Sequence, residues 1–233
     1  MNNIATFLRS SIGRKLMMAL TGLFLILFLV VHLAGNLQLL AGDGGEAFNR
    51  YSYFMANNAL IQTVSKLNFL FIILHVIYSI WLTRTNAAAR PVPYAGKAKE
   101  VQSQWSSRNM GILGTLILLF LIVHLKSFWY EFKFGAGLPM ITAGTYDGLN
   151  LDILDAYSVV ATAYASPIYV AIYLIGMTVL AFHLYHGFQS AFQTLGLGFS
   201  KYKKLIQTVG VIYSILIPVL FAIIPVVMHL QQH

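Results

Sequence analysis

The chain of 233 residues contains no cysteine. It therefore cannot form disulfides, hold an iron–sulfur cluster through thiolates or attach a c-type haem covalently. Charged residues are also scarce, at 9% of the chain against about 25% in an average soluble domain. Hydrophobic residues make up 58% and occur in long runs, which indicates a polytopic membrane protein.

Acidic residues are rarer than basic ones, 7 against 15, which gives a net charge of +8. Such a balance can indicate nucleic-acid binding, but here the basic residues lie in short segments between apolar runs. In a membrane protein this distribution is a topology signal. We therefore expect no nucleic-acid partner.

Five apolar segments predict transmembrane helices in an all-α bundle, which we expect to form a single domain over 1–233 with a multi-pass topology. The expected spans are 16–40, 67–85, 108–130, 167–193 and 207–230. The first has the basic start of a signal peptide, but its apolar run is long enough to span and no clear cleavage site follows. Pro91 and Pro93 predict a loop, and Pro218 and Pro225 a kinked last helix.

The basic residues also predict the orientation. One set of helix ends carries most of them: Arg9, Arg14, Lys15, Arg84, Arg90, Lys97, Lys99, Arg108, Lys201, Lys203 and Lys204. The opposite ends carry Arg50, Lys66, Lys126 and Lys133, with every acidic residue except Glu100. The positive-inside rule then predicts a cytoplasmic N-terminus and a C-terminus outside.

Each of the first four spans has a histidine within an apolar run and contains no Asp or Glu, and these histidines are His32, His75, His124 and His183. Counted along the helical rise, His32 and His124 lie roughly 25 Å from the cytoplasmic edge, and His75 and His183 roughly 15 Å from it. The four histidines thus form two pairs at matched depths.

Two opposed histidines on facing helices can hold a haem iron from both sides, so the spacing predicts two haems. A single membrane histidine can instead hydrogen-bond a neighbouring helix. A proton relay would be expected to include Asp or Glu, and a carboxylate-bridged di-iron site needs Glu-x-x-His motifs, which are missing. His186, three residues after His183, is an alternative ligand, and His229 and His233 are expected to be structural or exposed.

Several stretches resemble one known family. They are "VVHLAGN", "GGEAFNRYSYFM", "LHVIYSIWL", "LIVHLKSFW" and "YLIGMTVLAFHLYHGFQSAFQTLGL". In order and spacing they are similar to the five-helix, two-haem cytochrome b subunit of succinate:quinone oxidoreductases. That subunit is the membrane anchor of succinate dehydrogenase and fumarate reductase, in respiratory complex II and the tricarboxylic acid cycle. The likeness covers nearly the whole chain.

The resemblance implies that His32 and His124 are the axial ligands of a distal haem b near the outer face, and His75 and His183 those of a proximal one. It implies an electron-transport complex in the bacterial cytoplasmic (inner) membrane. An iron–sulfur subunit and an FAD flavoprotein subunit would be partners, with menaquinone as electron acceptor or donor. The chain would be a subunit of the enzyme that does not itself bind the dicarboxylate.

One position departs from the family. Some fumarate-reducing members have a glutamate two residues before the histidine of the fourth helix, where this chain has Ala181. The change argues against a proton path of that kind and favours succinate oxidation. Two alternatives stay open, namely the dihaem cytochrome b anchor of a formate dehydrogenase or hydrogenase, and a transporter or proton channel without haem.

Other residues are candidates for secondary sites. Glu46 is a candidate proton acceptor beside a quinone, or a solvated loop acid. Haem propionates need cationic or hydrogen-bonding partners, and the candidates are His186, Arg14, Lys15, Arg84 and Arg108. By elimination, the loop 83–109 and the segment "LGLGFSKYKK" are the expected docking surface for the iron–sulfur subunit.

Overall fold

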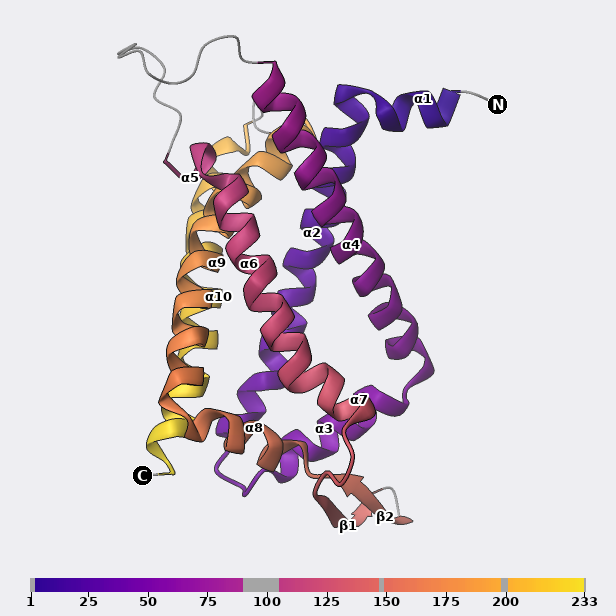
Figure 1. Ribbon diagram of the computed structural model, residues 1–233, viewed down its shortest axis with the longest axis vertical. Helices are drawn as coiled ribbons and strands as arrows, with labels where there is room; N and C mark the ends of the chain where they lie inside the picture. The colour runs from indigo at the N-terminus through magenta and orange to yellow at the C-terminus, as the bar shows by residue number, and fades with distance from the viewer. Residues whose placement is uncertain (1–2, 90–104, 147–148, 198–200, 233) are drawn as a thin grey trace. The chain divides into compact units, whose positions relative to one another are not determined.

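A computed structural model describes residues 3–89, 105–146, 149–197 and 201–232 (Figure 1). Within them the chain is mostly helical, and five helices are long and apolar enough to cross a membrane. These are Ser11–Leu40, Ala59–Ala88, Met110–Phe134, Pro167–Thr194 and Lys203–Leu230. The chain is thus a multi-pass membrane protein by length and composition. The predicted loop at Pro91 and Pro93 lies outside the described residues.

The long helices follow from the apolar runs, since a helix satisfies its own backbone groups where no water is available. Their labels are α2 (Ser11–Asn36), α4 (Ala59–Ala88), α6 (Met110–His124), α9 (Pro167–Thr194) and α10 (Lys203–Leu230). The 3₁₀ turn η1 (Leu37–Leu40) extends α2, and the π-helical turn η2 (Leu125–Tyr130) and α7 (Glu131–Phe134) extend α6. Pro167 opens α9, where the missing N–H has no helical partner to lose.

Shorter elements connect the spans: α1 (Asn3–Arg9), α3 (Glu46–Asn57), α5 (Trp105–Arg108), β1 (Met140–Tyr146), β2 (Leu149–Leu154) and α8 (Ala156–Ala165). The strands form an antiparallel hairpin in which Met140 is opposite Leu154. The expectation of an all-α chain therefore needs one addition, because this hairpin was not predicted. Its strands are short segments between two spans, where no long apolar run marks them.

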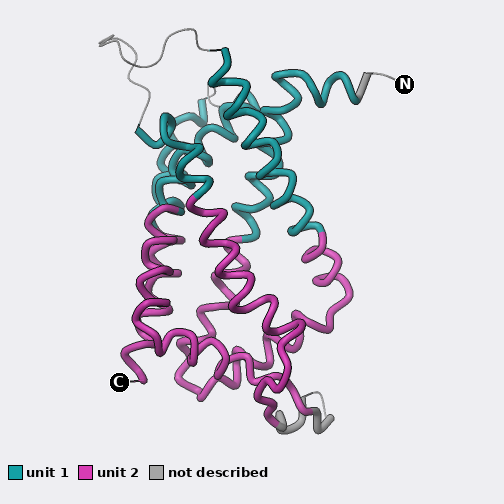
Figure 2. Tube along the Cα trace, in the orientation of Figure 1, with its two compact units in different colours: residues 1–28, 67–115, 180–215 teal, residues 29–66, 116–179, 216–233 magenta. Residues whose placement is uncertain are grey.

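The chain divides into two compact units (Figure 2). Unit 1 consists of 1–28, 67–115 and 180–215, and unit 2 of 29–66, 116–179 and 216–233. Each of the five long helices contributes part of its length to both. Large apolar side chains such as Leu27, Ile122 and Ile175 are exposed on them. Such surfaces are what a bilayer would cover.

Candidate functional site: two pairs of membrane histidines

Unit 1 brings together His75 of α4 and His183 of α9. Their ring centres are 6.3 Å apart and the ring planes are inclined by 59°. Each ring also lies beside a glycine of another helix: a Cβ on Gly22 of α2 would be 3.4 Å from Cε1 of His75, and one on Gly114 of α6 would be 3.9 Å from Cε1 of His183. The four helices thus approach one another around the two imidazoles without intervening side chains at these two positions.

The two histidines of unit 1 differ in how their Nδ1 atoms are bonded. Nδ1 of His75 lies 3.2 Å from the hydroxyl of Thr21, a residue of α2 that is only 2% exposed. Nδ1 of His183 is buried and has no hydrogen-bond partner among the described residues. A buried polar atom without a partner is uncommon in folded proteins and calls for an explanation such as a bound group.

Unit 2 brings together His32 of α2 and His124 of α6. The ring centres are 5.8 Å apart and the planes are perpendicular. Aromatic rings surround the pair, with Phe120 stacked on His124 at 5.9 Å and Phe221 at 5.6 Å from His32. This pair therefore has an aromatic environment, which excludes water and lowers the local polarity.

In unit 2, polar side chains contact the Nδ1 atoms of both histidines. Nδ1 of His124 lies 3.1 Å from the hydroxyl of Tyr173 on α9. Nδ1 of His32 lies 3.4 Å from the side-chain amide nitrogen of Asn36, which also donates to the backbone carbonyl of His32 at 2.7 Å. One histidine of each pair, His75 in unit 1 and His124 in unit 2, is therefore bonded through Nδ1 to a hydroxyl of a different helix.

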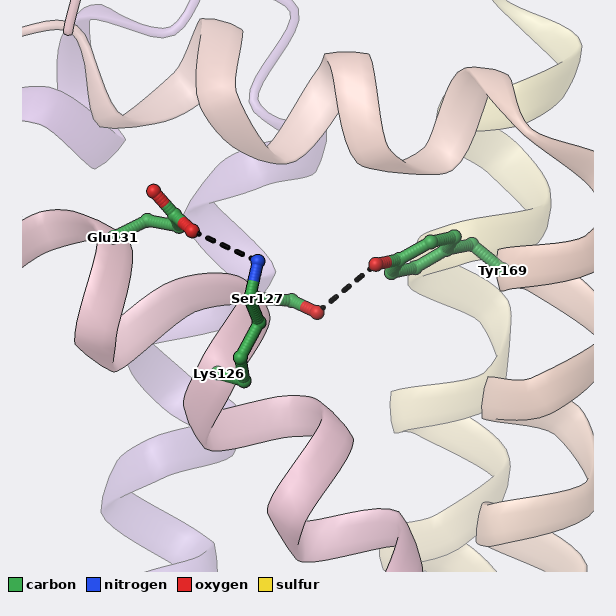
Figure 3. A network of polar contacts seen from close by, with 4 residues as sticks. All are labelled: Lys126, Ser127, Glu131 and Tyr169. Atoms are coloured by element: carbon green, nitrogen blue, oxygen red, sulfur yellow. Dashed lines mark hydrogen bonds and ion pairs between the residues drawn. The ribbon is translucent and has the colours of Figure 1, made fainter. Parts of the chain in front are cut away.

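A π-helical turn begins directly after His124 and was not predicted. Two of its residues, Lys126 and Ser127, make polar contacts with residues outside the turn (Figure 3). Nζ of Lys126 donates to Oε1 of Glu131 at 3.1 Å, and the hydroxyls of Ser127 and Tyr169 are 3.2 Å apart. π-Helical turns inside longer helices occur frequently at functional sites. Here the turn shifts the register of the residues that follow the histidine.

The donor set of each pair fits haem better than a bare metal ion. Two imidazoles on opposite sides of one first-row metal ion have their centres about 6 Å apart, because each nitrogen binds at about 2 Å. The observed separations, 6.3 and 5.8 Å, match this value, and they also lie in the range of direct ring contact. In the described residues no group of three or more His, Cys, Asp or Glu is placed to hold a metal ion. Two imidazoles suffice only if the remaining ligands come from a macrocycle.

The residues predicted as propionate partners differ in their surroundings. The guanidinium of Arg14 is 4.3 Å from the centre of the Trp81 ring, and its Nε donates to the carbonyl of Arg9. Lys15, Arg84 and Arg108 are exposed, and His186 is half-buried one helical turn after His183. Their use as propionate partners stays a prediction.

Glu46, the candidate quinone residue, is the first residue of α3 and is 65% exposed. Its Oε1 forms an ion pair with Arg50 at 2.8 Å, one helical turn further along. Its neighbour Asp43 receives the backbone N–H groups of Ala47 and Gly45, which hold the pKa of Asp43 below its usual value despite some desolvation. The role of Glu46 beside a quinone stays a prediction.

Sequence reasoning missed Thr21 and Tyr173, the two residues that bond the histidines. Both are common residue types in apolar helices, and nothing in their local sequence points to a distant ring nitrogen. A helical projection of α2 would place Thr21 only relative to its own helix. The partner in α4 becomes visible only when the helices are packed.

The fold and the paired histidines define a multi-pass helical membrane protein with two imidazole pairs, one in each compact unit. No family model, no curated protein and no solved structure matches this chain. The pairing expected from the depth count is present in the structure, and its use as a pair of haem sites stays a prediction.

Proposed function

We propose that the chain is a dihaem cytochrome b that anchors a succinate:quinone oxidoreductase in the bacterial cytoplasmic membrane. It would pass electrons between an iron–sulfur subunit and menaquinone, as a subunit of the enzyme that leaves the dicarboxylate to a flavoprotein. The observation that carries the haem part is the pairing of four membrane histidines as two opposed imidazoles per unit. The identity of the complex rests on the resemblance of the quoted segments.

The chain's own residues would do three things at each pair. His75 and His183 would hold one haem iron in unit 1 through their ring nitrogens, and His32 and His124 would hold a second in unit 2. Haem bound in this way supplies a one-electron carrier with no open position for oxygen. Packed apolar and aromatic side chains would exclude water, and hydroxyl groups on Nδ1 would hold a ring in place.

Charge supports the proposed orientation and the proposed place of the soluble partners. The described part of unit 1 contains no acidic residue, whereas its basic residues are Arg9, Arg14, Lys15, Arg84, Arg108, Lys201, Lys203 and Lys204. We place these ends on the cytoplasmic side by the positive-inside rule. The iron–sulfur subunit would dock there, against segments that lie partly outside the described residues.

Haem content tests the proposal. Purified wild-type chain should contain two haem b groups by pyridine-haemochrome quantitation and a reduced-minus-oxidised spectrum. Changing His75 or His183 to Ala should remove one haem, and changing His32 or His124 to Ala should remove the other, because each iron loses one axial ligand.

His186→Ala is the matched control, since it removes an imidazole one turn from His183 and should leave both haems. If His186→Ala removes a haem and His183→Ala does not, the ligand assignment in α9 is wrong. A folded, helical wild-type chain that binds no haem contradicts the cytochrome proposal altogether.

The soluble partners are tested separately. Chain isolated from its native membrane in mild detergent should co-purify with a flavoprotein and an iron–sulfur protein, and the complex should reduce a quinone analogue with succinate. Co-purification with a molybdenum or nickel enzyme instead would assign the same anchor to a formate dehydrogenase or hydrogenase.

A further inference from the structure

We propose that Thr21 is a positioning residue for His75, one that fixes which ring nitrogen of that histidine carries the proton. The inference rests on the proposed haem function, because it concerns how one axial ligand is prepared. Thr21 lies on α2 and His75 on α4, so the contact joins two membrane helices. The Thr21 hydroxyl oxygen and Nδ1 of His75 are 3.2 Å apart.

The direction of this hydrogen bond follows from counting protons. The Thr21 hydroxyl has one hydrogen, and its oxygen lies 2.8 Å from the carbonyl of Met17 and 3.2 Å from that of Met18. The Met17 carbonyl is the nearest of the three possible acceptors, so we assign the hydroxyl hydrogen to it. With that hydrogen used within α2, the Thr21 oxygen accepts from His75, and Nδ1 carries the hydrogen.

A neutral imidazole has one N–H, so a hydrogen on Nδ1 leaves Nε2 with a free lone pair. That is the form needed for binding iron through Nε2. Metal-bound histidines generally donate their other N–H to an oxygen in this way, which fixes the ring and raises its basicity. Thr21 would therefore fix His75 in the tautomer that can bind iron before haem is bound.

The contacts of the Thr21 hydroxyl differ from those of an ordinary threonine in a helix. Threonine hydroxyls in helices often bond the carbonyl four residues earlier, as that of Thr178 does with Leu174 at 2.9 Å. Thr178 is exposed, whereas Thr21 is buried and has the additional contact with a ring nitrogen. Tyr173 is placed similarly at His124, but its hydroxyl is also bonded to that of Tyr164, so the donor there is not fixed.

The test replaces Thr21 by Val, which keeps the shape and removes the hydroxyl, and by Ser, which restores it. Thr178→Val is the matched control. The measurement is a potentiometric titration of both haems, with the haem of unit 1 identified as the one that His75→Ala removes. A ring without an acceptor for its N–H is a weaker base, which favours reduced iron. We expect Thr21→Val to raise the midpoint potential of that haem alone, and Thr21→Ser and Thr178→Val to leave both potentials unchanged.

Unchanged potentials in Thr21→Val would overturn the inference, as would equal shifts in Thr21→Val and Thr21→Ser, which would indicate packing alone. A second readout needs no haem: ¹⁵N NMR of histidine-labelled protein before haem is added should show the Nδ1–H form of His75 in wild type and a mixture of forms in Thr21→Val. If wild type shows the Nδ1–H form of His75 but binds no haem, the proposed function is contradicted and the role of Thr21 is supported. Wild type with two haems and no effect of Thr21→Val would support the proposed function and contradict the role of Thr21.

Discussion

At the scale of single residues, glycines mark how closely the helices approach the histidines. Gly176 of α9 lies against Phe120 of α6, and a Cβ there would be 2.5 Å from Cδ2 of that ring. Phe120 in turn stacks on His124. Gly114 has more room, since the nearest atom to its Cβ would be 3.9 Å away. Gly176 is therefore required by packing, whereas Gly114 leaves space beside His183.

This contrast predicts opposite effects of adding a methyl group. Gly176→Ala should destabilise the chain by about 1–3 kcal/mol, because Phe120 has to move in a packed core. Gly114→Ala should be neutral or stabilising by up to about 1 kcal/mol, since alanine favours helix and meets only an ordinary contact. Thermal unfolding in detergent measures both. Equal destabilisation by the two variants would mean that the approach of α9 to α6 is not as described.

At the scale of elements, α8 is held in place by its first residues. Asp155 caps it by accepting the backbone N–H of Ser158 at 3.1 Å. Asn49 of α3, only 2% exposed, donates to Asp155 at 2.9 Å and accepts from the backbone N–H of Tyr157 at 2.8 Å. The polar side chains thus tie two short helices together.

The cap gives a prediction about pH. Burial raises the pKa of Asp155, but the hydrogen bonds from Ser158 and Asn49 outweigh it and hold the pKa below its usual value. A lowered pKa in the folded state means that the carboxylate stabilises the fold above the usual carboxyl pKa and loses this effect as the pH falls through the lowered value. Asp155→Ala should therefore cost about 1 kcal/mol at pH 7, as for other lost caps, and less below about pH 4.

Asp155→Asn separates charge from capping, because asparagine is also a good cap. Its unfolding temperature should lie below that of wild type at pH 7 and approach it only at about pH 2, where the carboxyl of the folded wild type is also protonated. A difference between wild type and Asp155→Ala that stays constant from pH 7 to pH 3 would show that the charge of this carboxylate contributes nothing. Thermal unfolding followed by circular dichroism provides the measurement.

At the scale of the whole molecule, the uneven distribution of charge predicts the orientation in the membrane. The chain has no cysteine, so a single introduced cysteine is the only target of a thiol reagent. Ser11 and Gln231 are exposed and lie near the two ends of the described chain. By the positive-inside rule, Ser11→Cys should react with an impermeant maleimide only after the cell membrane is opened, and Gln231→Cys should react in spheroplasts. The reverse pattern would contradict the orientation and, with it, the proposed docking side.

The sequence by itself determined the five helices that are long and apolar enough to cross a membrane, and it predicted which histidines pair. Both are one-dimensional properties: a run of apolar residues long enough to span is visible without neighbours, and a helix rises evenly, so depth can be counted from a charged end. The short helices α3 and α8 and the hairpin were missed, because they are stabilised by contacts such as Asn49 with Asp155, far apart in the chain.

Only the tertiary structure decided which residues contact the Nδ1 atoms of the histidines. An amphipathic pattern indicates at most which side of a helix differs from the rest, and not which neighbouring helix that side meets. Thr21 and Tyr173 could therefore not be assigned to His75 and His124 from the sequence alone. The π-helical turn after His124 was likewise not predicted, since the segment Leu125–Tyr130 contains no proline or glycine that would mark an irregularity in a helix. Depth along a helix is a local property, whereas rotation about its axis is set by its neighbours, and the hydrogen bonds to the histidines depend on that rotation.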